Sequence, residues 1–207
     1  MEGTHSLELR ALSNAASMLV REGWARSSSG NISLRSRSVL GAFPTGSFPI
    51  LSKSMATDRA DGTLLWISRT GCTMVQLSKD PTGNAGLYRS ARDRLDLLSG
   101  TGPPSTEATA HLLVIAGTGQ NACVHCHWDD IVGISDRALK VALPDSIGAT
   151  PSLPPGSIEL AEATLREAMY HHTVLWPYHG IFATGRDLDD CLSNLRRARK
   201  FFDGPEG

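Results

Sequence analysis

Three histidines have the residue type and spacing to bind a metal ion. His125 and His127 lie two residues apart in NACVHCHW, a segment whose pattern predicts a short strand. Because side chains alternate along a strand, both imidazoles should leave the same face and could hold one ion in adjacent positions. His179 is the best third ligand, since it precedes Gly180 in a strand-like setting and glycine permits close approach. Three neutral imidazoles would leave open positions on a zinc-like ion for substrate oxygens, although His-x-His pairs also occur as plain strand residues.

A carboxylate and a further histidine lie in the segment PPSTEATAHLLVIA. Ser105 or Thr106 is a predicted N-cap for a helix that carries the apolar run 112–116. Glu107, in its first turn, could stabilise the helix dipole or act as a general base aimed into a cleft beside the metal, and spacing leaves both readings open. His111 lies one turn later on the same face, where we expect a buried or supporting histidine and not a ligand.

Polar turns at three places could bind a phosphate group. Hydroxyls, exposed backbone amides and a helix N-terminus together can hold an anion without a P-loop, although each turn alone is an ordinary turn. The candidate segments are Ser29-Gly30-Asn31, Ser68-Arg69-Thr70-Gly71 and Ser105-Thr106.

The cysteines favour structural roles. Cys123 and Cys126 form a C-x-x-C, but residues three apart on a strand face opposite sides, so these two should pack and not share a ligand. The four cysteines of the chain are scattered, which favours reduced thiols over disulfides.

The first third of the chain predicts a helix followed by strands. Apolar residues recur at helical spacing over residues 9–20 and stop at Gly23, which predicts an amphipathic helix ended by a glycine. A polar turn then leads into an alternating strand at residues 32–34. Residues 36–62 show no sustained period and predict a long loop or weak strands, and LLWIS is the next strand.

The last third alternates helix and strand. Residues 141–157 are rich in proline, glycine and serine and predict a connection with little regular structure. Apolar residues at helical spacing predict a helix over 158–169, and a strand pair should follow around Pro177. Asp187 is the predicted N-cap of a final amphipathic helix.

Length and composition indicate one ordinary globular domain over residues 1–207. The chain is 41% hydrophobic and 20% charged, and its 20 basic and 21 acidic residues nearly cancel. A near-zero net charge favours a small-molecule partner over nucleic acid or a membrane surface. The N-terminus lacks the basic-then-apolar layout of a signal peptide and no stretch is apolar enough to span a membrane, so we expect a cytoplasmic protein.

Five segments occur in an order that resembles the class II aldolase/adducin-head family: SSSGNIS, ISRTG, PSTEATAH, CVHCHW and HGIFATGRDL. Within that family the chain is most similar to the rhamnulose-1-phosphate aldolase branch, through VHCHW, PPGSIELAEATLREAM and VLWPYHGIFATG. The resemblance runs from about Gly23 to Lys200.

This resemblance implies a fold and a site. The fold would be a single-domain, three-layer α/β structure with a central, mainly antiparallel sheet flanked by helices, assembled as a homotetramer. Zn2+, or another divalent transition metal, would bind His125, His127 and His179, and Glu107 would be the catalytic acid/base. A ketose 1-phosphate would be cleaved to dihydroxyacetone phosphate and an aldehyde. The phosphate would contact Ser29, Gly30, Asn31, Thr70, Gly71, Ser105 and Thr106.

Other functions remain open within the same resemblance. Residues 141–157 form a shorter loop than is usual in the family, which leaves room for sugar-phosphate 4-epimerase or methylthioribulose-phosphate dehydratase chemistry. An adducin-like head without catalysis is a third possibility, disfavoured by the presence of all three histidines and Glu107.

Overall fold

The computed structural model of the protein describes residues 2–25, 30–37, 43–49 and 60–204. Nine strands in these ranges form one sheet in the order β2-β5-β4-β3-β1-β6-β9-β8-β7. Neighbouring strands are antiparallel except β7 and β8, which are parallel. The strands are β1 (Asn31–Arg35), β2 (Gly46–Pro49), β3 (Leu64–Ser68), β4 (Ala85–Ala91), β5 (Arg94–Gly100), β6 (Ala122–Cys126), β7 (Ile147–Ala149), β8 (Thr173–Trp176) and β9 (Gly180–Gly185).

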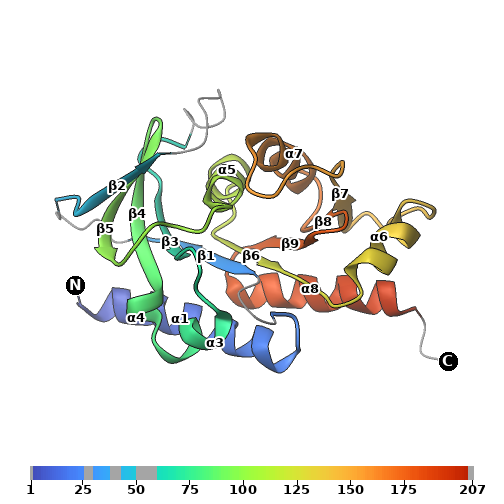
Figure 1. The fold of residues 1–207 in the computed structure, drawn as a ribbon, viewed down its shortest axis with the longest axis horizontal. Coiled ribbons are helices and arrows are strands. Elements are labelled where there is room, and N and C mark those ends of the chain that lie inside the picture. The colour runs from blue at the N-terminus through green and yellow to red at the C-terminus, as the bar shows by residue number, and fades with distance from the viewer. Residues whose placement is uncertain (1, 26–29, 38–42, 50–59, 205–207) are drawn as a thin grey trace.

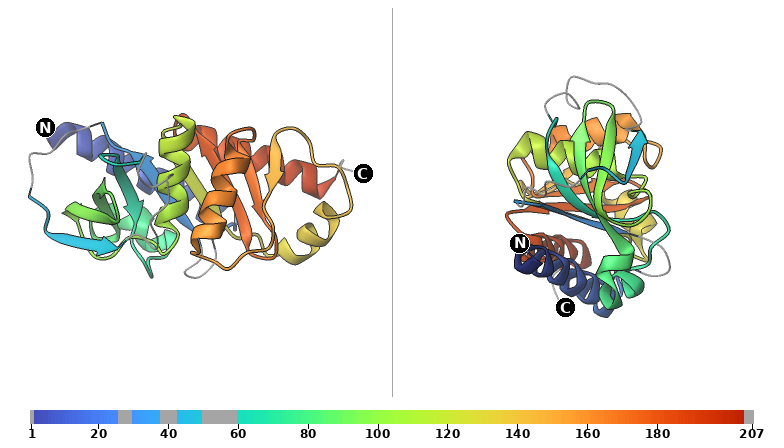
Figure 2. Two further views of the ribbon diagram at one scale, coloured as in Figure 1. Left: turned by 90° about the horizontal axis from the view of Figure 1, so that it is seen from above. Right: turned by 90° about the vertical axis from the view of Figure 1, so that its left-hand side faces the viewer.

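Helices cover both faces of the sheet. Figure 1 shows α5 (Ala108–Thr118) and α7 (Ile158–Ala168) on one face. On the opposite face lie α1 (Glu2–Arg21) and α8 (Leu188–Asp203), with the short α3 (Met74–Lys79) and α4 (Pro81–Asn84). The right-hand view of Figure 2 shows the same sheet between the two helical layers. The predicted three-layer α/β class with a mainly antiparallel sheet is therefore confirmed.

The sheet separates two apolar cores, and β6 contributes to both. Ala122, Val124 and Cys126 pack with α1 and α8 in one core, whereas Cys123 packs with α5 and α7 in the other. This alternation confirms that Cys123 and Cys126 face opposite sides of the sheet. All four cysteines of the chain are buried and free, as expected for packing residues.

Several predicted elements appear close to their expected bounds. The first helix ends before Gly23, whose φ of 71° is the left-handed conformation of a helix-ending glycine. Ser157 caps α7 by accepting a hydrogen bond from the Leu160 amide, and Asp187 caps α8 in the same way through the Asp190 amide. LLWIS is β3, and the strand pair around Pro177 is β8 and β9.

One expectation differs from the structure, and two segments predicted to have little regular structure each contain a short strand. Neither Ser105 nor Thr106 is the N-cap of α5: that position belongs to Glu107, whose side chain makes no capping hydrogen bond, and the Ser105 hydroxyl accepts from the Glu107 amide at 3.3 Å. Residues 141–157 contain β7, which pairs in parallel with β8 at the edge of the sheet. The segment 36–62, predicted as a long loop or weak strands, contains the short β2, and its residues 38–42 and 50–59 lie outside the described ranges.

Other elements had no counterpart in the sequence interpretation. They are α3, α4, the β4–β5 hairpin and α6 (Ile131–Ala138), which lies beyond the β7 edge of the sheet (Figure 1). No helix in the described part of the chain has both the length and the apolar character needed to cross a membrane.

Candidate active site

Two neighbouring strands position the three histidines. His125 lies in β6, His127 follows its last residue, and His179 immediately precedes β9. Cys126 pairs with Ile181 across β6 and β9, so the carboxyl end of β6 lies beside the amino end of β9. One ring nitrogen from each histidine lies within 4.8 Å of the others. The structure thus brings the three predicted ligands together.

Burial keeps these imidazoles neutral, and a hydrogen bond fixes which ring nitrogen of His125 can bind a metal ion. Nδ1–H of His125 donates to the Ile181 carbonyl at 3.0 Å, which leaves Nε2 unprotonated and 2.9 Å from Nε2 of His127. Desolvation holds the pKa of His125 well below its usual value and lowers the pKa of His127. Burial and the nearby His127 lower the pKa of His179 to about 4. At neutral pH all three rings are therefore available as metal ligands.

Two glycines make room for His125. A Cβ at Gly180 would lie 2.6 Å from the His125 ring and 2.9 Å from the His127 ring, and 2.6 Å from the Cys126 carbonyl oxygen. On the other side, a Cβ at Gly30 would lie 2.7 Å from the His125 carbonyl oxygen, and Gly30 has a φ of 87°. Only glycine fits at these two places. Gly180, the residue that marked His179 in the sequence, is therefore required for steric reasons.

The turn that carries His179 is held by α6. Tyr178 adopts a left-handed φ of 64°, a conformation that non-glycine residues rarely take. Its N–H donates to the Ser135 hydroxyl at 2.8 Å, and its phenol donates to Asp136 at 3.0 Å. The Trp176 ring lies against His125, with centroids 4.4 Å apart. These contacts fix the approach of His179 to the other two ligands.

Glu107 faces the same point from the start of α5. Its carboxylate is only 6% exposed and accepts a hydrogen bond from Asn31 Nδ2 at 2.7 Å. Oε1 lies 3.2 Å from Nε2 of His179, and Oε2 lies 3.5 Å from Nε2 of His125. Burial raises the pKa of Glu107, and the Asn31 hydrogen bond opposes that shift. The helix-start carboxylate is therefore directed into the cluster and not toward solvent.

The chemistry of this cluster fits a divalent cation. Three neutral imidazoles and a carboxylate converge, and all four groups present lone pairs to the same region. Zn–N bonds of about 2.0–2.1 Å require ligand nitrogens a few ångströms apart, as these are. Nδ1 of His179 is buried and has no hydrogen-bond partner among the described residues. No described hydrogen bond at Nδ1 therefore holds the ring proton on Nε2, and Nε2 can bind an ion. Three imidazoles with open positions are the pattern of catalytic zinc sites.

The predicted phosphate residues line one cavity of about 230 Å³ with the cluster. Ser105 N–H donates to the Ser68 carbonyl and Thr70 N–H to the Pro103 carbonyl, each at 3.0 Å, which ties the two turns together. Ser29 lies outside the described residues. The predicted residues that line this cavity are Gly30, Asn31, Thr70, Gly71, Ser105, Thr106, Glu107, His127 and His179.

The cavity has further lining residues: Arg69 belongs to a turn already predicted to bind phosphate, whereas Cys72 and Pro155 were not assigned from the sequence. The Arg69 guanidinium donates to the Gly83 carbonyl at 3.1 Å and the Asn84 side-chain oxygen at 3.3 Å, and both acceptors are neutral. No described carboxylate pairs with Arg69, so its charge is available to a bound anion. Its place within the ISRTG turn was the available signal.

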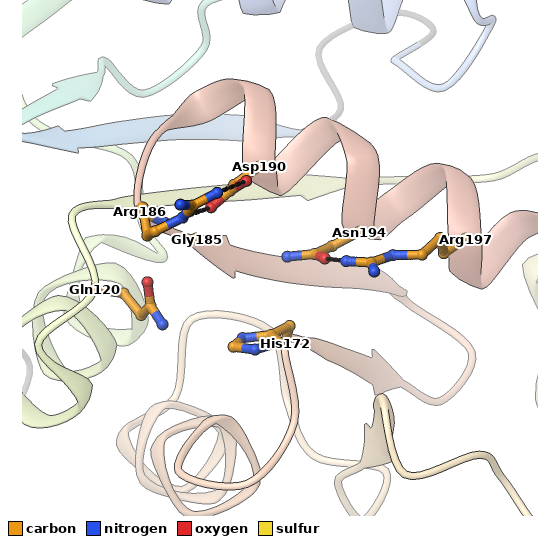
Figure 3. A pocket seen from close by; sticks show the side chains of 7 residues that line it. All are labelled: Gln120, His172, Gly185, Arg186, Asp190, Asn194 and Arg197. Atoms are coloured by element: carbon orange, nitrogen blue, oxygen red, sulfur yellow. Dashed lines mark hydrogen bonds and ion pairs between the residues drawn. The ribbon is translucent and has the colours of Figure 1, made fainter.

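A second cavity lies at the other end of α5 and β9 (Figure 3). It measures about 310 Å³ and is bordered by Gln120, which follows α5, and by Gly185, which ends β9. Figure 3 shows Arg186 directed at Asp190, with which it forms an ion pair of 2.5 Å. One histidine, the exposed His172, lines it. The second cavity therefore lacks the set of converging ligands that marks the first.

Sequence comparison identifies related proteins along nearly the whole chain. The family described as Class II Aldolase and Adducin N-terminal domain matches residues 10–202. A rhamnulose-1-phosphate aldolase of Citrobacter koseri is 25% identical over 229 residues, covering 95% of this chain and 83% of that protein. One from Escherichia coli is 26% identical over 211 residues, covering 86% and 77%. These matches bear out the predicted resemblance and the enzyme class, class II aldolase.

Solved structures share the fold. A sugar-phosphate aldolase from Thermotoga maritima superposes with a TM-score of 0.82 at 22% identity, covering 96% of this chain and 93% of that one. An L-fuculose 1-phosphate aldolase superposes with a TM-score of 0.72 at 17% identity, covering 96% and 84%. With this fold, these histidines and a family match over residues 10–202, the chain belongs to the class II aldolase and adducin N-terminal domain family.

Proposed function

We propose that this protein is a metal-dependent aldolase that reversibly cleaves a ketose 1-phosphate, of the rhamnulose 1-phosphate type, to dihydroxyacetone phosphate and an aldehyde. The observation that carries the proposal is the convergence of Glu107 on three neutral imidazoles at the wall of a polar cavity. The ligands would be His125, His127 and His179, and Zn2+ the ion. Named relatives that act on rhamnulose 1-phosphate and fuculose 1-phosphate support this substrate class.

The phosphate would lie between the two linked turns. Gly30, Asn31, Thr70, Gly71, Ser105 and Thr106, together with Ser29, would surround its oxygens. The Thr70 hydroxyl, which donates to the Pro104 carbonyl at 3.0 Å, would turn to donate to the phosphate. Arg69 supplies a positive charge at the same wall that no carboxylate in the described ranges neutralises. A dianion is therefore favoured over an unphosphorylated sugar, and anchoring it would fix the distance from the phosphate to the reacting carbons.

Glu107 would transfer the proton at the reacting carbon. In cleavage the bond between C3 and C4 of the ketose breaks, its electron pair stays with C3, and the C4 hydroxyl loses its proton to the Glu107 carboxylate as the aldehyde forms. Protonated Glu107 then delivers a proton to C3, which yields dihydroxyacetone phosphate, and in synthesis its carboxylate removes that proton. The raised pKa of buried Glu107 suits a group that must alternate between both forms. When bound, the ion would act as a Lewis acid that stabilises negative charge on the substrate's oxygens.

Assembly and location form part of the same proposal. An apolar groove of about 340 Å³ adjoins the site and shares Thr70, Ser105 and Thr106 with it, which suits a site completed at a contact between subunits of a homotetramer. The buried free thiols suit a reducing, cytoplasmic environment. Light scattering after gel filtration would test the tetramer, and an apparent mass of one chain would contradict it.

Metal analysis with a substrate panel tests the function. The purified protein should contain about one divalent transition metal ion per chain and release dihydroxyacetone phosphate from at least one ketose 1-phosphate. His127→Ala should lose both metal and turnover, whereas the same change at His172, an exposed histidine at the second cavity, should lose neither. Metal-loaded protein that converts sugar phosphates to epimers or dehydrated products without releasing dihydroxyacetone phosphate would replace the aldolase assignment. Protein without metal and without turnover would contradict it.

A further inference from the structure

A buried chain of hydrogen bonds connects Glu107 to the interior of the protein. Asn31 donates through Nδ2 to Glu107 Oε2 at 2.7 Å. The other side-chain atom of Asn31, Oδ1, is hydrogen-bonded to Nε2 of His111, whose Nδ1 lies 2.7 Å from the Ser33 hydroxyl. Ser33 and His111 are fully buried, and Asn31 is 6% exposed. Neither metal binding nor substrate contact explains why His111 is held in this chain of hydrogen bonds, because His111 lies outside both the cavity lining and the histidine cluster.

The direction of every bond in this chain follows from the ionised carboxylate. A carboxylate only accepts hydrogen bonds, so the Asn31 atom beside Glu107 must be the amide nitrogen. Asn31 Oδ1 then needs a donor, which places the ring proton of His111 on Nε2. Nδ1 of His111 is left as an acceptor for the Ser33 hydroxyl proton. Burial lowers the pKa of His111 to about 3, so the ring is neutral and keeps one donor and one acceptor.

We propose that His111 is a positioning residue for Glu107: its Nε2–H holds the Asn31 side chain in the orientation that presents Nδ2 to the carboxylate. Without this donor, the Asn31 amide can rotate and bring Oδ1 against the carboxylate, which would turn Glu107 away from the reacting carbon. The inference rests on the proposed function, because the effect on Glu107 would be measured as a change in the rate of proton transfer. The arrangement of the hydrogen bonds can be tested apart from that function.

Two substitutions at His111 separate positioning from general packing. A glutamine amide can reach the place of Nε2 and donate to Asn31, whereas an asparagine amide reaches only the place of Nδ1, beside Ser33. Both changes remove the ring contact with Phe182, whose centroid lies 5.0 Å from that of His111, and both give up one buried hydrogen bond. His111→Asn and His111→Gln should therefore lower the melting temperature by similar amounts and retain metal.

Only the asparagine variant should lose catalysis. We expect its kcat to fall about 10- to 100-fold, as is typical when an outer partner of a site is removed, with a smaller change in KM. His111→Gln should keep most of the wild-type kcat. Exchange of the C3 proton of dihydroxyacetone phosphate with heavy water should follow the same order, because that exchange reports proton transfer alone. Equal losses of kcat in the two variants at equal stability would overturn the proposal.

Nitrogen NMR keeps the inference testable if either variant fails to fold or if the substrate assignment is wrong. In wild-type protein carrying ¹⁵N-histidine, His111 should be a neutral imidazole protonated on Nε2, in the presence and absence of metal. A His111 protonated on Nδ1 would overturn the inference whatever the activity of the protein. Absence of turnover on every ketose 1-phosphate, with the Nε2–H form observed, would instead contradict the proposed function and leave the hydrogen-bond arrangement standing.

Discussion

Replacing Gly180 with alanine should damage the histidine cluster without altering any ligand. The added methyl carbon would lie 2.6 Å from the His125 ring, 2.9 Å from the His127 ring and 2.6 Å from the Cys126 carbonyl oxygen. Carbon atoms in ordinary contact are about 3.5–4.0 Å apart, so the overlap with the His125 ring is on the order of 1 Å. The neighbours cannot yield cheaply, because Cys126 pairs with Ile181 within the sheet and His125 is hydrogen-bonded to the same residue.

The size of the effect follows from this overlap. Inserting one methyl group into a packed interior costs about 1–3 kcal/mol of unfolding free energy. At roughly 2–4 °C per kcal/mol for a chain of this length, the melting temperature of the metal-free protein should fall by about 2–12 °C. Relief of the overlap requires the His125 and His127 rings to move, so we also expect metal affinity to fall about 10- to 100-fold.

Thermal unfolding of the metal-free protein and a competitive chelator titration measure the two effects. Gly46→Ala is the matched control, because Gly46 also lies in a strand and a Cβ there would meet the Phe48 ring at an ordinary 3.5 Å. The control should unfold at the wild-type temperature or slightly above it and bind metal normally. Wild-type stability and metal affinity in Gly180→Ala would refute the claim that glycine is sterically required there.

Three further predictions concern charge. Glu107→Gln should keep metal and lose about 10²- to 10⁴-fold in kcat. Burial raises the pKa of Glu107, which means that the buried charge destabilises the fold, so the metal-free variant should be at least as stable as wild type at pH 7 in a denaturant titration. Arg69→Gln should raise KM for a ketose 1-phosphate and leave turnover of the unphosphorylated ketose unchanged; an unchanged KM in initial-rate assays would contradict the role of its charge. Burial lowers the pKa of His179 to about 4, so the unfolded chain binds more protons below about pH 6.5, and stability of the metal-free protein should be lost as pH falls from there through about 4. A flat unfolding free energy over that range would count against neutral ligands.

Much of the site could be predicted because its signals are local. The alternation of a strand places His125 and His127 on one face, and the structure keeps them together. The position of His179 depends on the pairing of β6 with β9, which no local pattern contains, so the sequence pointed to it only through the following Gly180 and the ordered motifs. His111 was expected to be buried and to support the site, and the structure shows which atoms it contacts.

The unpredicted elements depend on tertiary contacts. Helices α3 and α4 span only six and four residues, too short for a periodic signal, and are held by the capping side chains of Thr73 and Asp80. β7 is three residues long and gains its hydrogen bonds from β8. The capping expectation for α5 was wrong because Glu107 itself occupies the N-cap position and extends toward Asn31. That residues 1–207 form one domain stays a prediction.

The order in which the ligands occur along the chain has a consequence for biosynthesis. His125 and His127 leave the ribosome first, and residues 128–178, which include α6, β7, α7 and β8, are synthesised before His179. A nascent chain that ends before His179 can therefore offer only two of the three nitrogens, and tight binding of an ion becomes a late event in maturation. Retention of metal against a chelator would then distinguish fully folded molecules from stalled ones in a single preparation.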